Sequence, residues 1–122
     1  MDKEFDELSH RIIKSAIEVH KALGPGFLES IYQAALLLQL KKDEFHVEEQ
    51  KEVTIYFDGK PIGMHRLDMV VNNQIIVELK AVEAFDESHI AQVISYLKAT
   101  GLKIGLLLNF SKATLKIKRI VL

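Results

Sequence analysis

Three residues whose side chains can carry out hydrolytic chemistry lie near one another in the sequence: Asp68, Glu78 and Lys80. They fall in the segment 62–81, where apolar and β-branched residues flank a polar turn, as is typical of two paired strands. Glu78 and Lys80 are two positions apart, so on a strand their side chains point to the same face. Two carboxylates on adjacent strands can hold a hard divalent cation, which lowers the pKa of its bound water and neutralises charge on a phosphate. A neighbouring lysine can orient that water, help to deprotonate it or stabilise developing negative charge.

Whether Asp68 joins this pair depends on the register of the two strands. A two-residue turn at 72–73 sets Asp68 opposite Val77, whereas a three-residue loop at 72–74 sets it opposite Glu78. A slip of one residue moves every side chain of a strand to the other face, so the apolar pattern can distinguish the two registers. The three-residue loop gives one face with Leu67, Met69, Val71, Ile75, Val77 and Leu79, and another with Arg66, Asp68, Val70, Ile76, Glu78 and Lys80. The other register mixes both sets, so we predict the three-residue loop, with an Asn or Gln residue in the left-handed conformation.

A simpler interpretation of the same residues is a ladder of surface ion pairs. Arg66, Asp68, Glu78 and Lys80 would be cross-strand neighbours of opposite sign, and such pairs are common on exposed strands. The spacing alone leaves this interpretation and the metal site both open.

The elements that must position these residues follow from the hydrophobic periodicity. Apolar residues follow helical spacing up to residue 46, apart from an interruption at Gly24-Pro25-Gly26. After residue 46 apolar and polar residues alternate, and helical spacing of the apolar residues returns at 85–100. The predicted order is helix, helix, three strands, helix and two strands, at 5–23, 27–45, 47–57, 62–71, 75–81, 85–100, 103–109 and 115–121. This order predicts an α/β fold in which helices flank a mixed sheet.

Composition limits the remaining possibilities. A chain of 122 residues and 13.9 kDa fits a single domain over 1–122. The sequence has no cysteine, which excludes disulfides and thiolate metal sites, and its histidines lack zinc-ligand spacing. The N-terminus is acidic without an apolar signal region, and the apolar runs are too short to cross a bilayer, so we expect a cytoplasmic protein without membrane partners. Seventeen acidic and sixteen basic residues provide no global attraction for nucleic acid.

At these motifs the chain resembles a known group of enzymes. Asp68 followed by Glu78-Leu79-Lys80 resembles the split motif of the PD-(D/E)XK nuclease superfamily, which has a restriction-endonuclease-like fold. Gly26, Glu29 and Tyr32 match the G-x-x-E-x-x-Y signature of the small GxxExxY proteins within that superfamily. The flanking segments are also similar, at His20, 23–26, 66–68, 78–82, 97–101 and 108–110. The superfamily's usual proline before the aspartate is replaced here by Leu67.

The resemblance implies a metal-dependent nuclease with one or two Mg²⁺ or Mn²⁺ ions. Asp68 and Glu78 would be metal ligands, joined by the Leu79 backbone carbonyl, and Lys80 would be the catalytic lysine. Glu29 would reach the same ions from the second helix. A residue near the start of a helix can instead return a hydrogen bond to the N-cap, so this alternative role of Glu29 stays open.

The resemblance also implies substrate contacts. Gln92 and Tyr96 resemble a Q-x-x-x-Y motif that lies beside the site, and we expect Tyr32 and Arg66 to contact substrate as well. On residue type alone, Tyr32 could equally be a half-buried core residue, and Gln92 and Tyr96 could lie at a core edge.

We therefore predict a nuclease whose expected substrate is DNA. The alternative is a catalytically weak nuclease-fold module that binds or assembles with a partner, and a homodimer or partner protein is compatible with either hypothesis. Four basic residues near the C-terminus, Lys112, Lys116, Lys118 and Arg119, could follow a phosphate backbone or form a solvated edge strand. His65 could line the rim of the cleft or lie exposed on its strand.

Overall fold

The computed structural model describes residues 3–122, with side chains described from residue 7. It confirms the predicted α/β class and the order of elements. The helices are α1 (Lys3–Leu23), α2 (Glu29–Lys42) and α3 (Glu87–Thr100). The strands are β1 (Val47–Phe57), β2 (Lys60–Val71), β3 (Ile75–Lys80), β4 (Ile104–Asn109) and β5 (Lys116–Val121).

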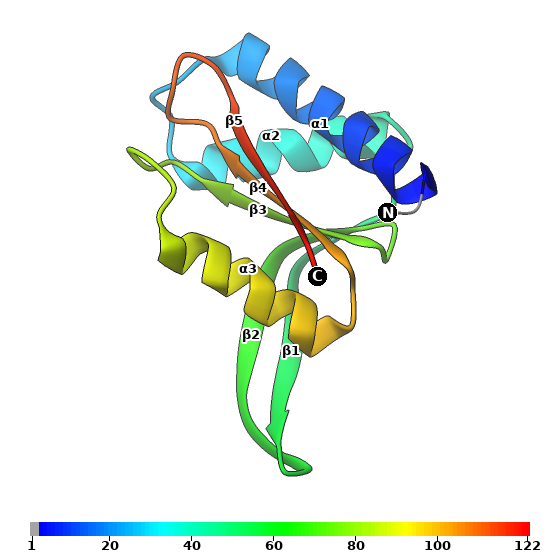
Figure 1. The fold of residues 1–122 in the computed structure, drawn as a ribbon. Coiled ribbons are helices and arrows are strands. Elements are labelled where there is room, and N and C mark those ends of the chain that lie inside the picture. The colour runs from blue at the N-terminus through cyan, green and yellow to red at the C-terminus, as the bar shows by residue number, and fades with distance from the viewer. Residues whose placement is uncertain (1–2) are drawn as a thin grey trace.

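The five strands form one mixed sheet in the order β1-β2-β3-β4-β5. β3 and β4 run parallel and are connected through α3, whereas the other neighbouring pairs are antiparallel. α1 and α2 cover one face of the sheet and α3 crosses the other (Figure 1). None of the helices formed by residues 3–122 is long and apolar enough to cross a membrane.

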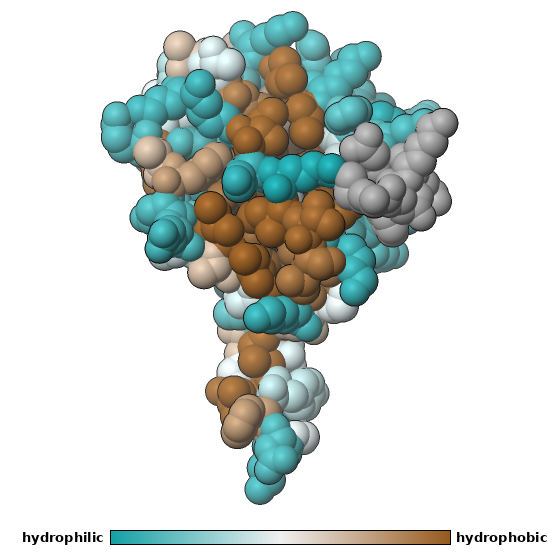
Figure 2. All heavy atoms as spheres, in the orientation of Figure 1, coloured by the Kyte–Doolittle hydropathy of each residue, from teal (hydrophilic) through white to brown (hydrophobic). Residues whose placement is uncertain are grey.

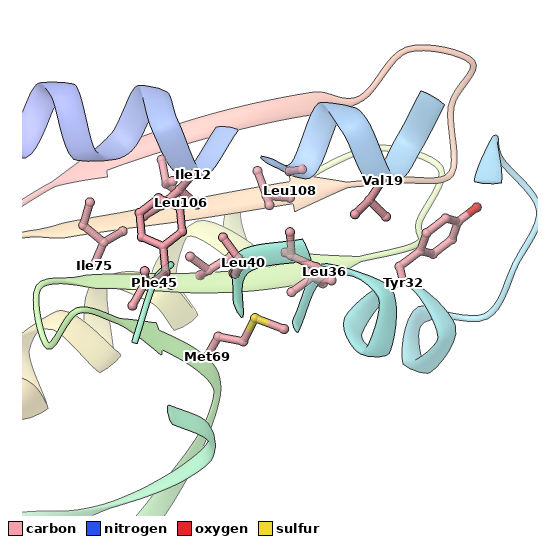
Figure 3. Close-up of a cluster of buried hydrophobic side chains, with 14 of the residues drawn as sticks. Ile12, Val19, Tyr32, Leu36, Leu40, Phe45, Met69, Ile75, Leu106 and Leu108 are labelled. Atoms are coloured by element: carbon pink, nitrogen blue, oxygen red, sulfur yellow. The ribbon is translucent and has the colours of Figure 1, made fainter. Parts of the chain in front are cut away.

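The core on the α1 and α2 side is the larger of two apolar layers. α1 presents Leu8, Ile12, Ala16 and Val19 at helical spacing to the sheet, and all four are buried. Figure 3 shows side chains from α1 and α2 meeting those of β2, β3 and β4. The second helix is shorter than predicted: it ends at Lys42 instead of residue 45, because Glu44 takes a left-handed φ of 69° that a helix cannot contain.

The second apolar layer lies between α3 and the opposite face of the sheet. Val93 and Leu97 of α3 are fully buried against residues from β2, β3, β4 and β5. The helix begins at a capping box, in which the Asp86 side chain accepts from backbone N–H groups and the His89 ring accepts from the Asp86 N–H. It ends at Gly101, whose φ of 77° supplies the left-handed C-cap expected for this glycine.

The hairpin of β2 and β3 has the predicted register. Met69 pairs with Val77 and Val71 pairs with Ile75, around a three-residue turn at 72–74. Asn72 and Asn73 take left-handed φ values of 52° and 55°, which asparagine tolerates better than most residues.

One part of the predicted face pattern is wrong. Leu67 packs in the α3 layer, whereas Met69 packs in the α1 and α2 layer, so the alternation of faces breaks at Asp68. The same change of face occurs on β1, where Val47 and Val53 pack in different layers although both would face one layer in a regular strand. The change of face falls at Gln50, which takes a left-handed φ of 50° between the pairs Glu49–Met69 and Lys51–Leu67.

Beyond this point β1 and β2 leave the body of the molecule as a two-stranded arm, residues 51–66 (Figure 1). The arm ends in the turn Asp58-Gly59, where both residues have positive φ, as the Asp-Gly pair predicts for a hairpin.

The packing of α3 on the sheet depends on the absence of a side chain at Gly105. A Cβ atom there would lie 2.4 Å from Val93 Cγ1, which is a severe overlap. We expect Gly105→Ala to lower the free energy of unfolding by roughly 1–3 kcal/mol, measured by urea denaturation. Gly63→Ala is the matched control, because a Cβ at Gly63 meets nothing within 4 Å. Equal stability of the two variants would contradict this account of the α3 contact.

Candidate active site

The side chains of Asp68 and Glu78 join β2 to β3 where the backbone pairing ends. The Asp68 N–H donates to Glu78 Oε1 at 2.9 Å, and the Leu79 N–H donates to Asp68 Oδ2 at 3.0 Å. Each carboxylate therefore accepts a hydrogen bond from a backbone N–H of the other strand. In continued strand pairing, a backbone carbonyl would be the acceptor. The exchange fixes both carboxyl groups beside each other, as the predicted register requires.

This arrangement places Glu78 in a demanding electrostatic environment. Its side chain is 3% exposed. Burial, and then the negative charge of Asp68, raise its pKa to about 8, while the positive charge of Lys80 opposes the shift. Two crowded carboxylates of this kind favour either a shared proton or a cation that neutralises them.

Lys80 lies on the same side of the strand pair and contacts α3. Its Nζ donates to Gln92 Oε1 at 3.1 Å. Tyr96, one turn further along α3, has its pKa raised to about 12 by burial and by the negative charges of Glu78 and Asp68. The Tyr96 hydroxyl therefore stays protonated and can donate a hydrogen bond. The structure thus brings Gln92 and Tyr96 to the charged residues of the hairpin.

Glu29 reaches the same group of residues from the first turn of α2. Burial and the charge of Asp68 raise its pKa, while Lys80 and a hydrogen bond from the Ala81 backbone lower it. It is the first residue of the helix, after an N-cap residue Leu28 that makes no side-chain capping bond. Glu29 is therefore not at the N3 position, and the alternative role as a capping-box residue is wrong.

Tyr32 lies in the core beside the loop that leads into α2. Its hydroxyl donates to the Gly24 carbonyl and accepts from the Phe27 N–H, and its ring stacks on Phe110 with centroids 4.6 Å apart. These bonds fix the loop that precedes Glu29, so Tyr32 positions that part of the site. Direct contact between Tyr32 and a substrate stays a prediction.

Arg66 lies on the arm, where it pairs with Glu52 at 3.0 Å. Among the ion pairs formed by the side chains of residues 7–122, none joins Arg66 or Lys80 to Asp68 or Glu78. The predicted ladder of surface ion pairs is therefore not formed, and the contact of Arg66 with substrate stays a prediction.

Two histidines lie beside the site: His65, for which the sequence left the cleft rim and an exposed position both open, and His89, which sequence reasoning did not assign to the site. His65 packs edge-on against Tyr96, with ring centroids 4.6 Å apart, and its Nε2 is 3.3 Å from Ser95 Oγ. His89 forms the α3 capping box, in which its Nδ1 accepts from the Asp86 N–H. The spacing of His89, Gln92 and Tyr96 at i, i+3 and i+7 places them on one helical face and could have identified His89. No local pattern links His65 to Tyr96.

The donor set can be compared with what a cation needs. Among the side chains described, those of residues 7–122, no three His, Asp or Glu are arranged as a ready metal centre. One oxygen of Asp68 and one oxygen of Glu78 each accept a hydrogen bond from a backbone N–H. The donors are nevertheless carboxylate oxygens close together on rigid elements, which suits Mg²⁺ or Mn²⁺. The donor chemistry of these residues therefore fits a hard divalent cation.

Comparison with known proteins agrees with the fold and the motif. Residues 6–120 match the family model of the PD-(D/E)XK nuclease superfamily, and the chain belongs to this superfamily. Members of this superfamily generally use divalent metal ions. No curated protein matches the chain.

Among solved structures, the chain is similar to the crystal structure of SSO0001, with a TM-score of 0.61 and 21% sequence identity. The match covers 75% of this chain and 48% of that protein, so the chain spans about half of its length. At this identity the similarity supports the fold.

The raised pKa of Glu78 predicts how stability depends on pH in metal-free protein. The folded-state pKa, about 8, is above the ordinary value of 4.5. Protonated Glu78 therefore contributes stability below about pH 4.5, and this contribution is lost as the pH rises through 8. We expect the free energy of unfolding of wild type to fall relative to that of Glu78→Gln between about pH 5 and pH 9, measured by urea denaturation in a chelator. Parallel pH profiles for the two proteins would contradict the burial of an ionisable group here.

Proposed function

We propose that this protein is a metal-dependent nuclease that hydrolyses phosphodiester bonds in DNA, and that it belongs to the GxxExxY group of its superfamily. The observation that carries the proposal is the reciprocal bonding of Asp68 and Glu78, with Lys80 beside them. Gly26, Glu29 and Tyr32 support the narrower family assignment. Both helical layers pack on one sheet, which supports a single domain over 1–122.

Each residue has a role that its surroundings support. Asp68, Glu78 and Glu29 would hold Mg²⁺ or Mn²⁺. The bound cation would neutralise charge on the phosphate and lower the pKa of its water. Lys80, held by Gln92, would orient the attacking water or stabilise negative charge on the phosphate. Tyr96, protonated at neutral pH, would donate a hydrogen bond to a phosphate oxygen.

A weak or inactive nuclease-fold module is the second candidate. The observation that favours it is the engagement of Asp68 and Glu78 with backbone N–H groups, which a cation must compete against. Metal binding and cleavage, tested separately, distinguish the two candidates.

The first test is cleavage of single- and double-stranded DNA by the purified chain with Mg²⁺ or Mn²⁺. We expect Lys80→Ala and Asp68→Ala to lower the cleavage rate by about 100-fold or more, because each removes a group that acts on the water or holds the cation. Glu18→Gln, on the outer face of α1 and half exposed, is the control that should leave the rate unchanged. Activity that persists in both site variants would contradict the proposed mechanism.

The second test is thermal denaturation with and without Mn²⁺. A cation that binds only the folded chain stabilises it by about 2.7 kcal/mol at 100 times its dissociation constant, so we expect a melting temperature several degrees higher. The increase should disappear in Asp68→Asn and become smaller in Glu29→Gln. Cleavage by wild type without any Mn²⁺ or Mg²⁺ effect would contradict the metal role, and a metal effect without cleavage would favour the module.

A further inference from the structure

The tip of the arm carries large apolar side chains that the fold does not bury. Tyr56, Phe57, Ile62 and Met64 are 63%, 71%, 65% and 55% exposed. Apolar residues continue along the arm where it projects from the body (Figure 2). Exposed apolar residues gathered in one place mark an interaction surface, whereas scattered ones are ordinary.

A groove separates the arm from α3. Its volume is about 390 Å³, and it is lined by Thr54, Ile55, Tyr56, His65, Ser95 and Lys98 together with Ala99. An aromatic ring therefore lies on one wall and an ammonium group on the other. This combination suits a nucleotide, whose base can stack on the ring while its phosphate pairs with the lysine.

The groove is continuous with the candidate active site through shared side chains. His65 and Ser95 line the groove, and His65 also packs against Tyr96. The Ser95 hydroxyl donates to the Gln92 carbonyl at 2.6 Å, and Gln92 accepts from Lys80. These contacts connect the wall of the groove to Lys80, so a strand whose phosphate lies at Lys80 would extend toward the groove and the arm.

The charges of the arm distinguish among nucleic-acid substrates. Lys51, Lys60 and Arg66 are nearly balanced by Glu52 and Asp58, and Arg66 is already paired with Glu52. Binding to the backbone of an intact duplex depends on several unpaired cations. The arm offers instead aromatic and apolar side chains, which bind exposed base faces with little dependence on sequence.

We propose that the arm and this groove bind exposed bases of the substrate, in a single strand or a frayed end, with Tyr56 and Phe57 stacking on bases and Lys98 contacting a phosphate. This inference rests on the proposed nuclease function and names its substrate class. His65 is then a positioning residue that connects the binding arm to Tyr96.

The test is the affinity of the Lys80→Ala protein in Mg²⁺ for a fluorescent single-stranded oligonucleotide and for the corresponding blunt duplex. We expect tighter binding of the single strand. Adding Tyr56→Ser and Phe57→Ser should weaken it by roughly 5- to 150-fold for each stacked base. The dependence of affinity on salt should stay the same, because no phosphate contact is removed, whereas Lys98→Ala should reduce it. Leu38→Ser is the matched control, since Leu38 on α2 is 71% exposed like Phe57.

Unchanged affinity in the double variant would overturn the inference, and so would tighter binding of the duplex than of the single strand. A third contradicting result would come from sedimentation. If wild type is a dimer and the double variant is a monomer, the arm binds a second copy of the chain instead. If the serine variant does not fold, the double variant Tyr56→Leu and Phe57→Leu replaces it, because leucine keeps the arm apolar. Loss of binding in this leucine variant supports stacking of bases on the aromatic rings. Cleavage by wild type is measured in parallel. Cleavage by wild type, together with binding that does not depend on the arm, would contradict this inference alone. Binding that depends on the arm, without cleavage, would contradict the proposed function alone.

Discussion

The exchange of hydrogen bonds between Asp68 and Glu78 is the interaction on which the rest of the site depends. Backbone groups of β2 and β3 that no longer pair with each other are satisfied by carboxylate oxygens instead. An unsatisfied buried N–H costs free energy, so the two carboxyl groups stabilise the hairpin and are held beside each other by the same bonds. Glu78 becomes buried next to a second negative charge as a result.

The surrounding elements place further charged and polar side chains beside these two carboxylates. Lys80 faces the carboxylates and is held by Gln92, and α3 can carry Gln92 and Tyr96 to them because Gly105 lets it approach the sheet closely. Glu29 adds another carboxylate from the opposite layer. A group of acids with one lysine is unfavourable unless protons or cations neutralise it, which is why its electrostatics and its proposed metal chemistry belong together.

Local patterns predicted the elements with good accuracy where short-range rules apply. Alternation of apolar residues and the asparagine turn specified the β2–β3 register, and Gly101 specified the end of α3. The face of Leu67 was predicted wrongly: the alternation breaks at the level where Gln50, on the neighbouring strand, takes a left-handed φ. A left-handed glutamine inside a strand has no sequence signature, so this change of face could not be predicted.

The sequence by itself determined which residue types could bind a cation and the register that brings Asp68 to the level of Glu78, because residue type and turn length are local properties. Only the tertiary structure decided that Glu29 meets them across the fold and that His65 touches Tyr96. It also decided that Glu78 is buried, and therefore that its pKa is raised. Burial and long-range proximity depend on how α2 and α3 pack on the sheet, and packing is a property of the whole chain.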